Sequence, residues 1–179
     1  AFGADDARFS MPMYHAMKCR DRLHVALKSG LRRLPFEKQT IVDLGPFPGS
    51  LLRLLRRLDY THSAQLCGAG LMVSDKFVEF MQRDVQADIH AVNLDPAGGQ
   101  FQSKGYPEKV PLPDNSVQLV FALEIIEHLT SPFHLLSEAY RVLGSGGHVV
   151  LTPLSVTRIG KVFKLLIGRT PNDRLAPPG

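Results

Sequence analysis

Continuous apolar segments alternate with amphipathic segments along most of the chain. Five apolar runs predict buried strands: 40–44, 64–71, 87–94, 117–123 and 147–153. Four segments with apolar residues three and four positions apart predict helices: 12–34, 50–58, 74–84 and 131–143. Strands made of continuous apolar residues are buried on both faces, which is typical of a parallel sheet. The alternation therefore predicts an α/β fold in which helices cover both faces of a mostly parallel sheet.

The length and composition are those of one globular domain. The chain has 179 residues, of which 44% are hydrophobic and 21% are charged. We expect a single domain over 1–179, with an N-terminal helical segment (1–36), a core (37–153) and a C-terminal helical extension (154–179). A stretch rich in glycine and proline at 95–116 is longer than most connections in compact domains, and such loops are often functional.

The remaining general signals favour a soluble, cytoplasmic protein. Cys19 and Cys67 lie far apart in apolar surroundings, which favours reduced cysteines over a disulfide or a zinc site. No apolar run approaches the roughly 20 residues that cross a bilayer, and the first ten residues lack the order of a signal peptide. The net charge of +4 is modest, so nucleic-acid binding is not indicated, although it stays open.

The segment IVDLGPFPGSLLRLL (41–55) runs from a predicted strand through a glycine-containing turn directly into a predicted helix. In an open parallel sheet, ligands bind beyond the carboxyl ends of the strands, where glycine lets the backbone approach and a helix N-terminus offers free N–H groups. Gly45 and Gly49 suit such a turn, but Pro46 and Pro48 have no N–H to donate. A plain connecting turn is an equally good explanation of this segment taken alone.

A second segment, VPLPDNSVQLVFALEIIEHLTSPFHLLSEAYRVLGSGGHVVLTP (110–153), closely resembles the central part of class I S-adenosylmethionine-dependent methyltransferases. With it, DLGPFPG (43–49) resembles the first motif of that family, an acid followed by Gly-x-Gly-x-Gly, with Phe47 in place of the middle glycine. The resemblance covers about residues 40–153. It implies a Rossmann-like, doubly wound sheet, S-adenosyl-L-methionine as cofactor, and methyl transfer by in-line displacement at the sulfonium.

The resemblance also implies a set of cofactor-binding residues. They are Asp43, Gly45, Pro46, Phe47, Gly49, Gly70, Leu71, Asp95 and Glu124. One departure is important, because the family pattern ends its second strand in an acid that binds the ribose hydroxyls, and Gly70 stands there in this chain. Two roles of Phe47 remain open, a ring that covers the methionine part of the cofactor or a side chain packed into the core against Leu51.

The strongest candidates for further chemistry lie in ALEIIEHL (122–129). Glu124, Glu127 and His128 stand at i, i+3 and i+4, so on one helical turn they could face the same way and bind a divalent metal. The Glu-x-x-Glu-His motif resembles that of metal-using O-methyltransferases. We favour a site without metal, in which Glu124 bonds to backbone at the cofactor pocket and Glu127 and His128 shape the turn. His128 is then the candidate general base, because an ordinary histidine pKa of about 6.5 suits it to take a hydroxyl proton.

The C-terminal part differs from the family pattern. The family sheet is completed by two further strands after the fifth, and no such strands follow residue 153 in this sequence. Either the given sequence is incomplete, or the sheet is shortened and has an exposed edge, which a partner chain could cover. The segment 159–167, with apolar and charged residues at helical spacing, could cover that edge or form a homodimer contact.

Three functions remain as hypotheses. The first is a methyltransferase that acts on the hydroxyl of a small molecule or glycan. The second is a metal-assisted O-methyltransferase of the kind that acts on RNA or quinone precursors. The third is a catalytically silent methyltransferase-like subunit that only binds. The sequence does not indicate the acceptor, because acceptor residues in such folds come from variable loops and terminal segments.

Overall fold

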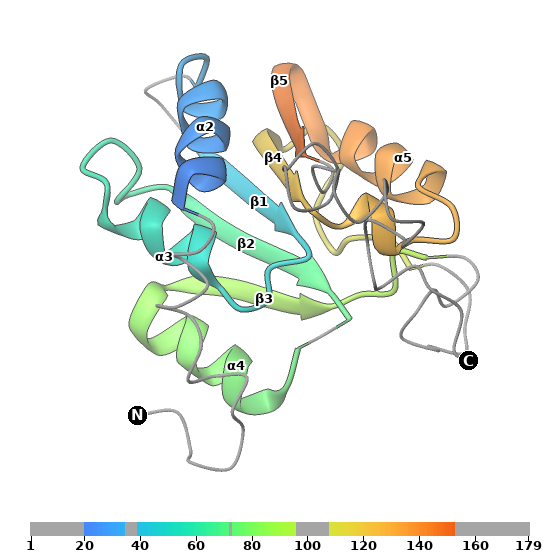
Figure 1. Ribbon diagram of the computed structural model, residues 1–179, viewed down its shortest axis with the longest axis horizontal. Helices are drawn as coiled ribbons and strands as arrows, with labels where there is room; N and C mark the ends of the chain where they lie inside the picture. The colour runs from blue at the N-terminus through green and yellow to red at the C-terminus, as the bar shows by residue number, and fades with distance from the viewer. Residues whose placement is uncertain (1–19, 35–38, 72, 96–107, 153–179) are drawn as a thin grey trace, which may run out of the picture.

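The computed structural model describes residues 20–34, 39–71, 73–95 and 108–152 (Figure 1). Three predictions lie outside these residues: the first part of the helix at 12–34, most of the loop at 95–116, and the C-terminal extension with its segment 159–167. Within the described residues no helix is long and apolar enough to cross a membrane.

A five-stranded parallel sheet forms the centre of the domain, in the order β3-β2-β1-β4-β5. The strands are β1 (Thr40–Leu44), β2 (Gln65–Gly70), β3 (Ala87–Ala91), β4 (Val117–Leu123) and β5 (Leu143–Thr152). The chain moves outward from β1 to β3 and then crosses to β4 on the other side of β1. The strand order therefore reverses between β1 and β4, where an open α/β sheet has its ligand crevice.

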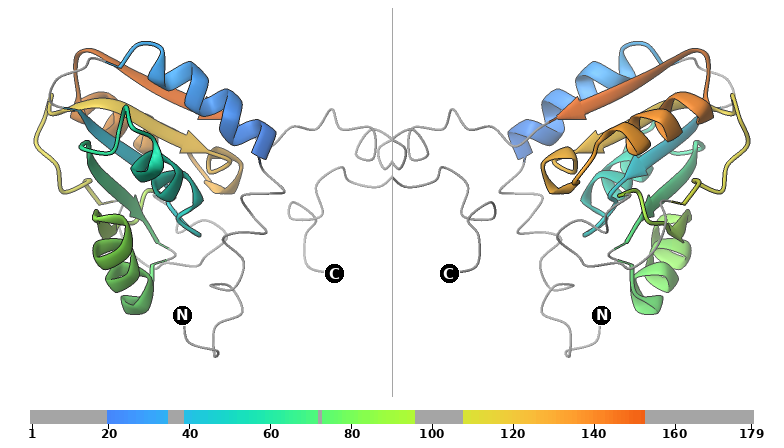
Figure 2. Two further views of the ribbon diagram at one scale, coloured as in Figure 1. Left: turned by 90° about the vertical axis from the view of Figure 1, so that its left-hand side faces the viewer. Right: turned by 90° about the vertical axis from the view of Figure 1, so that its right-hand side faces the viewer.

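Helices cover both faces of the sheet, as the alternation in the sequence predicts. They are α2 (Arg20–Leu31), α3 (Ser50–Arg57), α4 (Asp75–Phe80) and α5 (Phe133–Val142), with a π-helical turn η1 (Met81–Val85) and a 3-10 turn η3 (Ile126–His128). Core residues from α2, α3, α4 and η1 pack together on one face, whereas those from α5 pack on the other. Figures 1 and 2 show α5 across the sheet from α3 and α4. The predicted Rossmann-like, doubly wound architecture is confirmed.

The boundaries of the elements show which local signals were sufficient. The strands predicted at 40–44 and 117–123 have those bounds. The helix predicted from residue 74 begins there, because Ser74 caps α4 by accepting from the N–H of Phe77. Serine is a favoured cap residue, but at α3 the cap residue is Gly49 at φ 84°, so Ser50 already lies inside the helix and is buried. Strand β5 begins at Leu143, four residues before the predicted start, because Leu143 pairs with Val117 of β4 ahead of an irregularity in the register, after which pairing resumes at His148.

Candidate active site

The turn between β1 and α3 lies at the carboxyl edge of the sheet, next to the point where the strand order reverses. Gly45 has φ 85° and donates its N–H to the carbonyl of Ala69 at 2.9 Å, which ties the turn to the end of β2. Gly49 has φ 84° and donates its N–H to the carbonyl of Pro46 at 2.5 Å. Because Gly49 caps α3, the turn brings the N-terminus of this helix to the carboxyl edge.

Packing explains why two of the turn residues are glycine. A Cβ at Gly49 would lie 2.8 Å from Sδ of Met81, and a Cβ at Gly45 would lie 2.9 Å from Cδ1 of Ile125. Positive φ angles disfavour other residues at both positions. The sequence predicts that glycine at position 49 lets a ligand approach, but a side chain at this position would point into the core. Only its backbone remains available to the ligand site.

Phe47 packs on the helical layer. Its ring centroid is 5.8 Å from that of Phe77 in α4, with the planes inclined by 56°, and it contacts the core cluster that contains Leu51. An inclined pair of this kind is a favourable aromatic contact. The core role of Phe47 is therefore observed, while the half-buried ring still forms part of the surface of the turn.

Asp43 lies near the end of the central strand. It is 4% exposed, and its backbone is paired with Gly68 of β2 and Phe121 of β4. Desolvation by burial raises the pKa of this carboxyl to about 7. Burial thus favours the neutral form of this carboxyl, which makes Asp43 a weak anionic support for the turn.

The end of β2 carries no acid. Gly70 is the last residue of the strand, and the half-buried Leu71 follows it. The next acid that the structure describes is Asp75, which is exposed in the first turn of α4. Pro46 of the turn is buried against Gly70, with its Cδ 3.2 Å from the position of a Cβ at that residue. The predicted departure at the ribose position thus coincides with a tight contact between β2 and the turn.

Asp95 links the segment after β3 to the segment after β4, a contact that the sequence did not indicate. It is 2% exposed, and its carboxylate accepts the backbone N–H of Thr130 at 2.7 Å. Its own N–H is donated to the side chain of Asn93 at 3.0 Å. Because Thr130 follows β4 by seven residues, Asp95 joins the end of β3 to the segment that leads from β4 to α5. The predicted cofactor contact of Asp95 stays a prediction beside this structural role.

Glu124 follows β4 in an uncommon backbone conformation, with φ 54°. Its N–H is donated to the carbonyl of Thr152 at 2.7 Å, and its carboxylate forms an ion pair with Arg22 of α2. The first turn of α2 is thereby attached to the carboxyl edge of the sheet. Sequence reasoning missed Arg22, because a basic residue in an amphipathic helix carries no sign of its distant partner.

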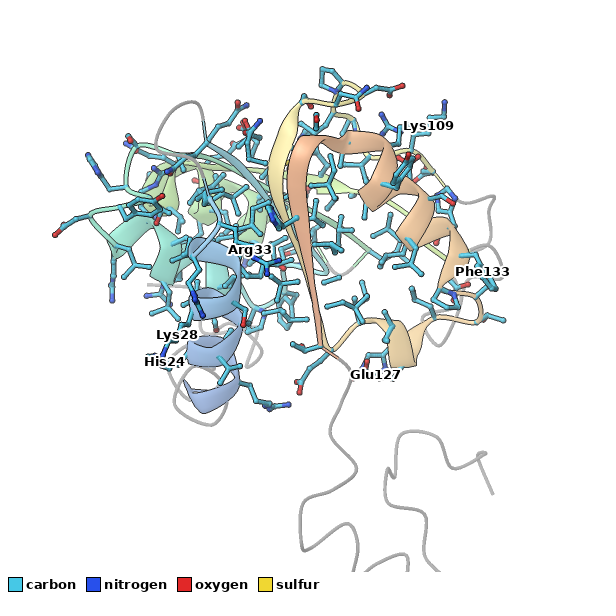
Figure 3. All side chains as sticks on the ribbon, turned by 90° about the horizontal axis from the view of Figure 1, so that it is seen from above. His24, Lys28, Arg33, Lys109, Glu127 and Phe133 are labelled. Carbon is cyan, nitrogen blue, oxygen red and sulfur yellow. The ribbon has the colours of Figure 1, made fainter. Side chains whose placement is uncertain are left out.

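Glu127 and His128 lie in the 3-10 turn η3, beyond the carboxyl ends of β4 and β5, where Figure 3 shows Glu127. The single helical turn predicted for Glu124, Glu127 and His128 is wrong, because Glu124 has a left-handed backbone conformation and lies before η3. Within the described ranges, no three His, Cys, Asp or Glu side chains cluster as a metal site would require. Both carboxylate oxygens of Glu127 are buried, with no hydrogen-bond partner in the part of the chain that is described.

Residues 42–151, more than half of the chain, match the family described as a methyltransferase domain. The chain belongs to this family. S-adenosyl-L-methionine is the methyl donor of the family, as the resemblance implied.

Individual relatives support the assignment. A malonyl-[acyl-carrier protein] O-methyltransferase from Marinomonas sp. (strain MWYL1) is 39% identical over 61 residues, which are 34% of this chain and 23% of that protein. A putative methyltransferase in complex with the Haloferax volcanii Trm112 methyltransferase activator has 25% identity and a TM-score of 0.52, over 83% of this chain and 61% of its own. A SAM-dependent methyltransferase from Aquifex aeolicus, at 16% identity and a TM-score of 0.51 over 94% and 89% of the two chains, shares the fold. The chain thus spans less than two thirds of the first two proteins.

The described residues fit the donor at one end of the site better than at the other. The turn at 45–49, the N-terminus of α3 and the rim after β4 form a polar backbone edge at the switch point, which suits the charged amino-acid end of the donor. Opposite them, the end of β2 lacks the carboxylate that binds ribose hydroxyls in Rossmann-type sites.

Proposed function

We propose that this methyltransferase domain transfers the methyl group of S-adenosylmethionine to the hydroxyl oxygen of a small molecule or glycan. One observation carries the oxygen specificity, the position of His128 relative to the donor turn. The backbone N–H of His128 is donated to the carbonyl of Ile125 at 2.9 Å, and the side chain of Ile125 packs on Gly45. One hydrogen-bonded turn therefore separates the backbone of His128 from Ile125, the residue that contacts the turn after β1.

The chemistry needs a base at this place. S-adenosylmethionine supplies an electrophilic methyl group, and a hydroxyl oxygen that attacks it must lose its proton during or after the transfer. A histidine with an ordinary pKa of about 6.5 accepts such a proton near neutral pH. His128 is half-buried on the rim that follows β4, beyond the carboxyl edge, and is our candidate for this role.

The experiment is an acceptor screen with donor labelled in the methyl group, followed by pH–rate profiles of the wild type and of His128→Gln. With a hydroxyl acceptor, we expect the variant to lose about 10²- to 10⁴-fold in kcat and to lose the rise in rate between about pH 5.5 and 7.5. Donor affinity measured by calorimetry should change little. An equal loss of donor binding would instead make His128 part of the cofactor site.

A carboxylate acceptor is the second candidate, because the Marinomonas relative is an O-methyltransferase for a malonyl group on acyl carrier protein. A carboxylate is already ionised at neutral pH, so methyl transfer to it requires no general base. Labelled product from an acidic acceptor, with a rate that His128→Gln leaves unchanged, would favour this candidate over a hydroxyl acceptor.

The metal-assisted and silent alternatives are separated by simpler measurements. Loss of transfer after chelation, with recovery on addition of a divalent metal, would support the metal-assisted reaction. Donor binding without transfer to any acceptor class would support a binding subunit.

We further propose that a second protein chain covers the free edge of β5. Among the described residues no strand pairs with this edge, and Val149 on it is 44% exposed. Such an edge invites pairing with another chain. A second copy of the chain is our first candidate, and an activator subunit like that of the Haloferax volcanii complex is the other. The buried, free Cys67 fits the cytoplasmic location that we propose.

A further inference from the structure

The end of β2 and the turn after β1 are packed together through two glycines. A Cβ at Gly68 would lie 2.7 Å from Cδ1 of Ile89 and 2.8 Å from Cβ of Pro46. A Cβ at Gly70 would lie 3.2 Å from Cδ of Pro46 and 3.3 Å from Cα of Gly45. Pro46 is buried. The proline ring therefore occupies the space in which side chains at both positions would begin.

Backbone conformation does not explain these two glycines. Among the described glycines, only Gly45, Gly49 and Gly146 have positive φ angles. Gly68 and Gly70 do not have positive φ angles, so what disfavours a side chain at these positions is the lack of space, which is more severe at Gly68 than at Gly70. The contact is also fixed by the backbone, since Gly45 donates to the carbonyl of Ala69 at 2.9 Å.

The place that Pro46 closes has a known use in Rossmann-type domains. An Asp or Glu about 20 residues beyond the first glycine normally binds the ribose hydroxyls from the end of the second strand. Two described acids that follow this strand along the chain have other surroundings. Asp75 is exposed on α4, and the carboxylate of Asp95 accepts from Thr130.

We propose that this chain binds the nucleoside end of its donor by shape, against Pro46 and without a carboxylate on the ribose. The ligands that fit are the adenosyl sulfonium donor and adenosyl thioethers, with a sugar that carries or lacks the 2′- or 3′-hydroxyl. The inference rests on the proposed function, because it takes S-adenosylmethionine as the donor. Pro46 is then a specificity-determining residue, which tolerates changes of the sugar that a carboxylate would reject.

Calorimetric titration of the wild-type chain with S-adenosylhomocysteine and with its 2′-deoxy and 3′-deoxy analogues tests the inference. A hydrogen bond to an ionised group contributes about 10-fold or more in affinity, so a carboxylate site would lose at least that factor with each hydroxyl removed. We expect both analogues to bind within about tenfold of S-adenosylhomocysteine. A larger loss for either analogue overturns the inference and leaves the donor assignment intact. If S-adenosylhomocysteine itself does not bind, the donor assignment fails, and the inference fails with it.

Two variants sharpen the test. Asp75→Asn should leave the affinity for S-adenosylhomocysteine unchanged, whereas a loss of about tenfold or more would assign the ribose to Asp75 and overturn the inference. Pro46→Ala removes the ring atoms that lie against Gly68 and Gly70, and it should weaken all three ligands by the same factor. Unchanged affinities, or a loss confined to the ligand with both hydroxyls, would contradict the role of Pro46. Circular dichroism melting curves check that each variant is folded.

Discussion

Replacing Asp43 by Asn should stabilise the domain at alkaline pH and flatten the dependence of its stability on pH. Burial raises the pKa of Asp43 in the folded chain to about 7, from a value of 3.8 in the absence of the fold. The folded state thus holds a proton that the unfolded state releases between about pH 4 and 7. The contribution of the neutral carboxyl to stability is complete below the unfolded pKa and is lost as pH rises through the folded pKa. Above pH 7 the domain must bury the charge.

The size of the effect follows from the two pKa values. Each unit by which folding shifts a pKa corresponds to about 1.4 kcal/mol. The free energy of unfolding of the wild type should therefore fall by about 3 kcal/mol between pH 4.5 and 8 because of this group. Asn is neutral at both pH values and nearly the same size as Asp. The difference in free energy of unfolding between Asp43→Asn and wild type should therefore grow by about 3 kcal/mol in favour of the variant over this range.

Urea denaturation at several pH values, followed by far-ultraviolet circular dichroism, measures this difference. The chain contains no tryptophan, so the backbone signal is the practical probe. Asp59→Asn is the matched control, because it removes an exposed carboxyl outside the sheet. A stability difference between Asp43→Asn and wild type that stays constant from pH 4.5 to 8 would refute the argument that the buried carboxyl titrates near neutrality.

Two further predictions concern packing. Gly49→Ala should lower the free energy of unfolding, measured by urea denaturation, by about 2 kcal/mol more than Gly146→Ala does. Both glycines have positive φ, but a Cβ at position 49 would meet Met81, whereas nothing lies within 4 Å of a Cβ at position 146. Equal losses would show that the backbone angle alone matters. Arg141→Lys should lower the free energy of unfolding by about 1–3 kcal/mol, because the planar guanidinium donates to the carboxylate of Glu138 and to the carbonyls of residues 110 and 112. A loss below about 0.5 kcal/mol would contradict the importance of these hydrogen bonds.

The strands and the class of fold were open to prediction from the sequence because the signals are local. A strand buried on both faces must be apolar throughout, so segments such as 40–44 and 117–123 are recognisable without their neighbours. The turn at 43–49 was also recognisable, since a strand, a glycine turn and a helix follow within 15 residues. These features depend on the order of residue types along the chain.

The roles of individual site residues depend instead on contacts between distant segments. The sequence placed Glu124 with Glu127 and His128 on one helical turn, but the structure pairs it with Arg22, about a hundred residues earlier. Local spacing could not show this, because the left-handed conformation at Glu124 breaks the helical period and a long-range ion pair leaves no periodic trace.

Gly70 shows most clearly the difference between what local sequence determines and what contacts between distant segments determine. The sequence alone determined that no acid ends β2, but not whether a side chain could be accommodated there. Only the tertiary structure decided that, because Pro46, more than 20 residues earlier, is brought by the β1–β2 pairing into the space above Gly70. Chain order fixes which residues are apolar, polar or small, whereas the excluded volume around each of them is set by segments that meet only after folding.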